Sequence, residues 1–211
     1  MPKYSRYQDY VIKDGRFVGE FEEMYRDFED PWEQSTRESV LSYKSIALFL
    51  CKKYKFRRVL EIGCGFGHFT KQIHELGIDV IGIDISETAT RKAAAQYPEC
   101  SFMCGDVLDF DIYEKFMPDC IIFSEVTWYI LDKIQKFLKY YNEIKWGKKI
   151  YIMHLLAMYS KGIQQYGIEY FSDLQGLLDY FDLDYEEYGQ ITYKELEGNA
   201  RTYFLGCSKS K

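Results

Sequence analysis

From residue 58 onward, short apolar runs alternate with helical segments, and this alternation restricts the fold more than any other feature of the chain. Five runs have the length and composition of strands: RVLEIG, DVIGIDIS, CSFMCGD, DCIIFSEV and KIYIMHLL. The run DCIIFSEV is almost entirely apolar, as expected for a strand that is covered on both faces. Helical segments follow the first, second and fourth runs, so we expect a doubly wound, mostly parallel α/β sheet.

The C-terminal part of the chain adds two further strands. The segments 184–193 and 201–208 are strand-like, and the short connection Glu197-Gly198-Asn199 between them implies an antiparallel pair at the edge of the sheet. A helix is expected before them, with Ser172 and Gln175 in capping-box positions. The strands together predict a seven-stranded sheet with an antiparallel edge strand.

The N-terminal segment is expected to form a helical cap on this core. Its apolar residues recur at helical spacing: Phe17, Phe21, Met24 and Phe28. Pro31 ends this helix, because the residue before a proline is pushed out of the helical region.

A second helix is expected to follow the cap. Ser35 and Glu38 have the spacing of a capping box, and the helix should end near Lys53. We therefore predict a single domain over residues 1–211, with the cap and first helix in 1–54 and the core in 55–211. Hydrophobic residues make up 47% of the 211-residue chain, which is enough to build one such core.

The charge of the chain disfavours a large polyanion as partner. The formal net charge is −6, and the longest basic runs are pairs such as Lys52-Lys53. Binding a phosphate backbone needs clustered lysine and arginine, so no nucleic-acid partner is expected.

The six cysteines indicate a reducing compartment. No CxxC pair occurs, and no histidine or second cysteine pair completes a zinc set. The first residues, MPKYSRYQDY, lack the apolar run of a signal peptide, and no stretch reaches the roughly 18 apolar residues of a membrane span. We therefore expect free thiols, no metal, no membrane association and a cytoplasmic location.

The glycine-rich motif EIGCGFG, residues 61–67, lies between the first predicted strand and its helix, where Rossmann-like folds bind a nucleotide. The dinucleotide motif GxGxxG needs a third glycine where this chain has His68 or Thr70, which disfavours NAD. The phosphate-binding motif GxxxxGK[ST] is absent from the sequence, so ATP chemistry is not expected.

The pattern E-x-G-x-G-x-G resembles the first motif of class I S-adenosylmethionine-dependent methyltransferases. Asp84, Asp106 with Val107, and SEVTWYI at 124–130 follow in the order of that family, and the resemblance covers roughly 55–155. It implies that Asp84 accepts hydrogen bonds from the ribose, that Asp106 and the Val107 N–H bind adenine, and that Glu125 lies beside the sulfonium. The implied cofactor site comprises Glu61, Gly63, Cys64, Gly65, Gly67, Asp84, Ile85, Asp106, Val107, Glu125 and Trp32.

The chemistry of the donor agrees with this resemblance. S-adenosylmethionine has no pyrophosphate and therefore needs no basic, anion-binding helix end. Its sulfonium and ammonium groups suit an acidic and aromatic cleft. Aromatic residues make up 18% of the chain.

The catalytic groups are harder to assign from sequence. His154, at the end of the fifth predicted strand, is the best-placed histidine for a general base, and the alternative is a buried core histidine. Glu125 and Tyr129 are expected beside the acceptor, with core packing as the alternative for Tyr129. Trp32 and Tyr25 are expected to close over the donor from the cap, and the alternative is a hydrophobic staple for the helix that follows.

The motifs FEDPWEQ and SEVTWYI resemble nodulation-type N-methyltransferases and related enzymes that modify sugars or surface-polysaccharide precursors. Trp128 stands where that group has the first of two aromatic residues, so the acceptor contacts do not transfer. The resemblance implies a small sugar-derived acceptor with a nitrogen or oxygen nucleophile, and a monomer or homodimer. The alternatives are a noncatalytic donor-binding protein and a methyltransferase that acts on protein or RNA.

Overall fold

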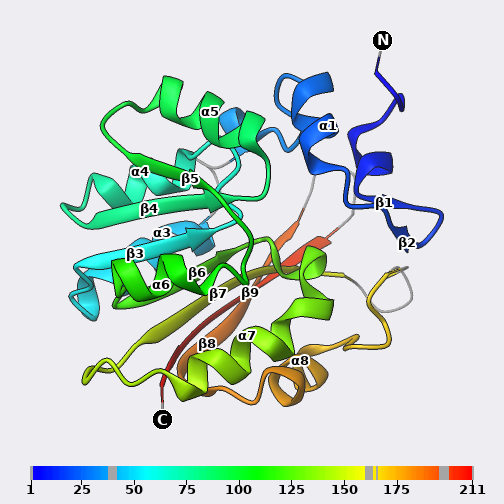
Figure 1. Cartoon of the computed structure of the whole chain (residues 1–211). Helices are drawn as coiled ribbons and strands as arrows, with labels where there is room; N and C mark the ends of the chain where they lie inside the picture. Colours follow the sequence, from blue (N-terminus) through cyan, green and yellow to red (C-terminus); the bar gives the residue numbers. More distant parts are fainter. Residues whose placement is uncertain (1, 38–41, 160–163, 165, 195–199, 211) are drawn as a thin grey trace.

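The computed structural model describes residues 2–37, 42–159, 164, 166–194 and 200–210. Its main feature is a seven-stranded sheet of order β5-β4-β3-β6-β7-β9-β8 (Figure 1). The strands are β3 (Arg58–Ile62), β4 (Asp79–Asp84), β5 (Ser101–Cys104), β6 (Cys120–Ser124), β7 (Tyr151–Met158), β8 (Asp184–Lys194) and β9 (Ala200–Lys209). The predicted α/β fold, Rossmann-like with a mostly parallel sheet, is confirmed.

The sheet register gathers the strand ends at one edge. Strands β5, β4, β3, β6 and β7 pair in parallel, whereas β9 is antiparallel to both β7 and β8. Ile62 of β3 is level with Ile83 of β4 and Phe123 of β6, so these strands end together. The residues that follow them therefore meet at the edge where sheets of this kind bind ligands.

Helices cover both faces of the sheet (Figure 1). Helices α3 (Ser42–Lys53) and α4 (His68–His74) bury apolar side chains on one face, together with Val59 and Ile122. Helices α6 (Phe110–Phe116), α7 (Leu131–Glu143) and α8 (Leu174–Phe181) cover the other face, together with Leu60 and Phe123. Helix α5 (Glu87–Gln96) packs beside β4 and β5. Side chains alternate between the faces along each strand, which explains why the runs are apolar throughout.

The N-terminal cap is not the single helical face that the apolar spacing predicted. A 3-10 turn (Tyr7–Tyr10) leads into a hairpin of β1 (Ile12–Lys13) and β2 (Arg16–Phe17), and only α1 (Phe21–Asp27) is helical. Asp14 and Gly15 both have positive φ, at 51° and 73°, as a two-residue hairpin turn requires. Phe17 therefore lies on a strand and not on the predicted helix.

The second predicted helix consists of α2 (Gln34–Arg37) and α3, which ends at Lys53 as expected. Asp30 and not Ser35 caps its start: the Asp30 carboxylate accepts from the backbone N–H groups of Gln34, at 2.9 Å, and of Ser35, at 3.0 Å. Glu38, the other half of the predicted capping box, lies outside the described residues, as does the connection 197–199.

Two further details differ from the predictions. Helix α6 follows β5 and was not predicted, because its short segment gives a weak periodic signal. Asp173 and not Ser172 caps α8, accepting from the Gly176 N–H at 2.8 Å. Across the described ranges, no helix combines the length and apolar character that crossing a bilayer requires.

Candidate functional site

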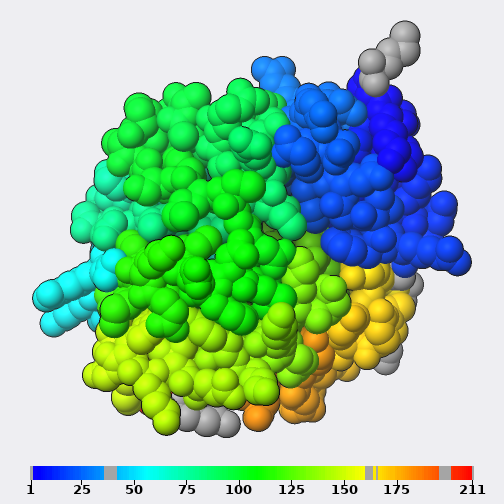
Figure 2. Space-filling view, in the orientation of Figure 1, coloured from blue at the N-terminus to red at the C-terminus, as the bar shows by residue number. Residues whose placement is uncertain are grey.

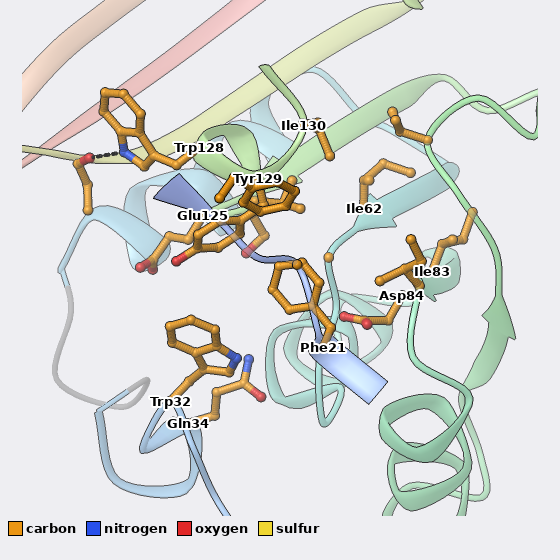
Figure 3. Close-up of a pocket in the computed structure, with 18 of the residues that line it drawn as sticks. Phe21, Trp32, Gln34, Ile62, Ile83, Asp84, Glu125, Trp128, Tyr129 and Ile130 are labelled. Atoms are coloured by element: carbon orange, nitrogen blue, oxygen red, sulfur yellow. Dashed lines mark hydrogen bonds between the residues drawn. The ribbon is translucent and has the colours of Figure 1, made fainter. Parts of the chain in front are cut away.

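A cavity of about 1020 Å³ lies between the carboxyl ends of the parallel strands and the N-terminal cap (Figure 3). The cap covers one side of it: in the space-filling view the N-terminal segment packs directly against the core (Figure 2). Ligand pockets typically occupy about 300–1,000 Å³, so this cavity has room for a nucleoside and a second small molecule. Nine of the predicted site residues line it: Tyr25, Trp32, Gly63, Asp84, Ile85, Asp106, Val107, Glu125 and Tyr129.

Asp84 ends β4 and points its carboxylate into the cavity (Figure 3). It accepts the Gly65 N–H on Oδ2 at 2.9 Å and the Ser86 N–H on Oδ1 at 3.0 Å. Burial raises the pKa of Asp84 to about 6, although these hydrogen bonds act in the opposite direction. Because a carboxylate has about four lone-pair sites, both oxygens can still accept from a pair of hydroxyls such as a ribose diol.

The cavity beside β5 has apolar walls and one carboxylate. Ile85, with 52% of its surface exposed, and Ile130 line it, together with Val107. The Lys133 ammonium of α7 forms an ion pair with Asp106 Oδ2, and the Leu108 N–H donates to Oδ1 at 3.0 Å. An apolar slot with an acceptor at its edge is suited to a base that carries an amino group.

Glu125 directly follows β6 and has a left-handed φ of 57°, which is uncommon for a non-glycine residue. Its N–H donates to the Leu155 carbonyl at 2.9 Å, and the Tyr43 hydroxyl donates to its carboxylate. The Lys44 ammonium, on a side chain that is 5% exposed, lies 4.0 Å from the same carboxylate oxygen. This strained turn brings a carboxylate to the cavity wall, where helix α3 supplies the Lys44 ammonium beside it.

Aromatic rings form the cavity wall nearest Glu125. The Tyr129 ring lies 5.8 Å from that of Trp32 and 5.3 Å from that of Phe21. Burial and then the neighbouring Tyr159 and Glu125 raise the pKa of Tyr129, so its hydroxyl is protonated at neutral pH. Trp32 and Gln34 of the cap lie across the cavity from Glu125 and Tyr129 (Figure 3).

Four predicted cofactor residues lie behind the cavity wall. Cys64 is 1% exposed, and the Thr70 hydroxyl donates to the carboxylate of Glu61, which is also 1% exposed. Gly65 and Gly67 belong to the glycine loop, but neither lines the cavity. These four residues therefore support the loop from the side that faces away from the cavity.

The structure does not bring His154 to the cavity. It lies within β7, is fully buried, and is surrounded by the rings of Phe123, Phe181 and Phe204. Its Nε2 is 2.7 Å from the Thr127 hydroxyl. Burial lowers the pKa of His154 to about 3, so the ring is neutral at physiological pH. His154 has the geometry of the core histidine that was its alternative assignment.

The residues that line the cavity but were not predicted from the sequence include Phe21, Gln34, Lys44 and Lys133. Gln34 and Lys44 precede the first strand of the core, and Lys133 lies on the solvent-rich side of an amphipathic helix. None of them follows the end of a parallel strand, whereas that position in the sequence is what identified Asp84, Asp106 and Glu125. Only their packing in three dimensions brings them to the site.

The sheet topology and the carboxylates at the ends of β4, β5 and β6 define a Rossmann-like nucleoside-binding fold. Residues 59–144 match the family described as a methyltransferase domain. This match confirms the predicted resemblance to S-adenosylmethionine-dependent methyltransferases and, with it, the predicted cofactor.

Relatives of known sequence match part of the chain. A phosphoethanolamine N-methyltransferase of Triticum aestivum is 30% identical over 106 residues, which are 48% of this chain and 21% of the wheat protein. A ubiquinone biosynthesis O-methyltransferase of Nitrobacter winogradskyi is 37% identical over 79 residues, 36% of this chain and 30% of that protein. The chain thus spans well under half of the length of these curated relatives.

A solved structure extends the likeness to most of the chain. The N-methyltransferase NodS of Bradyrhizobium japonicum WM9, in complex with S-adenosyl-L-homocysteine, superposes with a TM-score of 0.66 at 16% identity. The match covers 87% of this chain and 93% of NodS. At this identity the likeness establishes the fold.

Proposed function

We propose that this protein transfers the methyl group of S-adenosylmethionine to a nitrogen or oxygen of a small acceptor. The observation that carries the proposal is Asp84, whose buried carboxylate faces a large cavity and is held by the backbone of both the glycine loop and the following turn. S-adenosylmethionine, when bound, supplies a methyl group already activated by the sulfonium. Orienting the acceptor against it accounts for much of the acceleration.

Each part of the cavity has a task in this proposal. Asp84 accepts from the ribose, and Ile85, Asp106 and Val107 hold the adenine. Glu125 and Tyr129 orient the acceptor, and the Glu125 carboxylate, which lines the cavity, could take its proton. We leave His154 out of the catalytic set, because its ring is enclosed by aromatic side chains.

For the acceptor we propose a sugar-derived molecule or a surface-polysaccharide precursor. The rings of Trp32, Tyr129 and Phe21 support this proposal, because aromatic faces with polar tips suit a ring that has both apolar and hydroxyl-bearing surfaces. The likeness to the N-methyltransferase NodS and to the bifunctional kinase-methyltransferase WbdD, with a TM-score of 0.57, supports methyl transfer, and NodS agrees with a nitrogen acceptor. Six free cysteines agree with a reducing, cytoplasmic location.

The first experiment is calorimetric titration with S-adenosylmethionine, S-adenosylhomocysteine and NADH. We expect both sulfur ligands to bind and NADH not to. Asp84→Ala should weaken binding of the sulfur ligands by about 1.5–3 kcal/mol, the scale of a hydrogen bond to a charged group. Asp79→Ala is the matched control, because Asp79 begins the same strand at its opposite end and is largely exposed. Equal affinity in the wild type and Asp84→Ala would contradict the ribose assignment.

The pH dependence of binding is a second test of Asp84. Hydroxyls donate to the ionised carboxylate, and the pKa of Asp84 is raised to about 6. Affinity for S-adenosylhomocysteine should therefore fall as the pH decreases through about 6, and this dependence should be absent in Asp84→Asn.

Turnover separates catalysis from donor binding alone. Isotopic methyl transfer from labelled S-adenosylmethionine to amino-sugar and sugar-phosphate acceptors should give a labelled product. Tight donor binding without transfer to any sugar, protein or RNA acceptor would instead make this a noncatalytic donor-binding protein.

A further inference from the structure

Two side chains of the cap contact the glycine loop: the Tyr25 ring packs against that of Phe66, and Gln34 forms a hydrogen bond with the loop backbone. The backbone of Gln34 is held at the start of α2, because the Gln34 N–H donates to Asp30 Oδ1 at 2.9 Å. Its side chain crosses to the loop, where Oε1 accepts from the Phe66 N–H at 2.9 Å. The side chain also lines the cavity, where it lies beside Trp32 (Figure 3).

Because Gly65 has no side chain, the side chain of Gln34 can pack directly against it. A Cβ at Gly65 would lie 2.6 Å from Gln34 Oε1, 2.7 Å from Gln34 Nε2 and 2.9 Å from the Tyr25 hydroxyl. Gly65 also has a φ of +54°. The middle glycine of the motif thus admits a side chain of the protein itself, and the amide of Gln34 becomes part of the loop surface.

The contact with Phe66 determines which way the amide faces. Only the carbonyl oxygen can accept from a backbone N–H, so Nε2 points away from Phe66. No hydrogen bond of Nε2 occurs within the described part of the chain, where Gln34 is otherwise bonded through its N and Oε1. Two N–H donors therefore remain for a ligand, and leaving them unpaired once a ligand excludes water would be costly.

The order of the strands determines which part of the donor can reach Gln34. Strands β5, β4 and β3 are neighbours, and they carry the adenine slot, Asp84 and the glycine loop at their ends. A ligand with its base at β5 and its ribose at β4 must direct its remaining end toward β3 and Gln34. That end of S-adenosylmethionine is an amino acid, and of its two charged groups only the carboxylate accepts hydrogen bonds.

We infer that Gln34 binds the carboxylate of the donor through Nε2, so that the cap supplies a cofactor-binding residue. The inference rests on the proposed function, because it presumes that the ribose lies at Asp84. This contact gives the cap a direct part in donor recognition. The amino-acid end of a bound donor would hold α2 against the glycine loop.

The test compares two ligands on matched variants. S-adenosylhomocysteine carries the amino-acid end, whereas 5′-methylthioadenosine keeps the adenosine and the sulfur but lacks it. Gln34→Glu retains an acceptor for the Phe66 N–H and replaces the two donors with a negative oxygen. It should weaken S-adenosylhomocysteine binding about 10-fold to 100-fold and change 5′-methylthioadenosine binding by no more than about twofold.

Two further variants keep the result interpretable. Gln34→Met removes the donors, together with the acceptor of the Phe66 N–H, without adding charge; it should weaken S-adenosylhomocysteine in the same selective way but to a smaller extent. Gln96→Glu makes the same chemical change at an exposed position on α5 and should leave both affinities unchanged. Thermal melting without ligand establishes that each variant is folded.

The outcomes separate this inference from the proposed function. Equal weakening of both ligands in Gln34→Glu, or no weakening of S-adenosylhomocysteine, would overturn the role of Gln34 and leave the methyltransferase proposal intact. A folded wild type that bound neither ligand would instead overturn the proposed function.

Discussion

Two buried titratable residues show how burial leads to different roles at the scale of single residues. Asp84 is 7% exposed, and its carboxylate is held by two backbone N–H groups at the cavity. His154 is fully buried among aromatic rings, and within the described ranges its ring nitrogens lie within hydrogen-bonding distance of two hydroxyl groups only, those of Thr127 and Tyr185. Asp84 can therefore contact a ligand, whereas His154 packs in the core and makes the stability of the protein sensitive to acid.

His154 should make the protein sensitive to acid. Its pKa is about 3 in the folded state against an ordinary 6.5, so the unfolded chain binds a proton that the folded protein rejects. Stability should therefore decline as the pH falls from about 6.5 toward 3, by up to about 1.4 kcal/mol per pH unit from this residue. Urea unfolding between pH 7 and pH 5 should give a shallower pH dependence for His154→Phe than for the wild type.

The same variant tests the catalytic alternative. Folded His154→Phe should retain its affinity for S-adenosylhomocysteine and its methyl-transfer rate, because the ring does not line the cavity. A rate reduced about 100-fold or more in a folded protein would restore His154 as a general base.

At the scale of elements, the glycine loop uses its three glycines differently. Gly63 lines the cavity, and Gly65 makes room for Gln34. Gly67, in the left-handed region at the start of α4, packs against Phe102 of β5. The motif therefore contacts the cavity, the cap and strand β5. Of its three glycines, Gly63 alone lines the cavity.

Gly67→Ala and Gly77→Ala form a matched pair for this element. Both glycines have a φ near +76°, at 77° and 76°, but a Cβ at Gly67 would lie 2.5 Å from the Phe102 ring and one at Gly77 would meet nothing within 4 Å. Gly77→Ala should cost about 1 kcal/mol of backbone strain. Gly67→Ala should cost about 1–3 kcal/mol more, from overpacking, as measured by urea unfolding. Equal losses would mean that the Phe102 ring moves aside freely.

At the scale of the whole molecule, the cap is tied to the core beside the donor site. The Glu22 carboxylate of α1 accepts from the Ser86 hydroxyl at 2.6 Å and from the Thr88 N–H at 3.0 Å, at the start of α5. The Lys92 ammonium of α5 donates to the Tyr25 carbonyl at 2.8 Å. Because Ser86 also donates its N–H to Asp84, the attachment of the cap and the ribose site share one turn.

Glu22→Ala should loosen the cap while leaving the core folded. Removal of the carboxylate leaves the start of α5 without these acceptors, so amide exchange in residues 21–27 should accelerate about tenfold or more. Affinity for S-adenosylhomocysteine should fall as well, since Trp32 and Gln34 depend on the position of the cap. Glu23→Ala is the control, because Glu23 is about half exposed and pairs with Arg26 in the same helix. Unchanged exchange in Glu22→Ala would show that apolar packing alone holds the cap.

The sequence by itself determined the α/β class, the mostly parallel sheet with its antiparallel edge, and the positions of Asp84, Asp106 and Glu125 at the ends of strands. These features are local: a parallel strand carries its own apolar run, and the residue after it lies at the ligand-binding edge whatever the rest of the chain does. The resemblance to the methyltransferase family depended on the same local signals.

Only the tertiary structure decided the rest of the site. The hairpin turn at Asp14 and Gly15 interrupts the helical spacing of the cap, and the placement of α8 and β9 encloses His154. Gln34 and Lys133 reach the cavity from segments far apart in the chain. Contacts between such segments depend on how whole elements pack, and no short stretch of sequence carries that information.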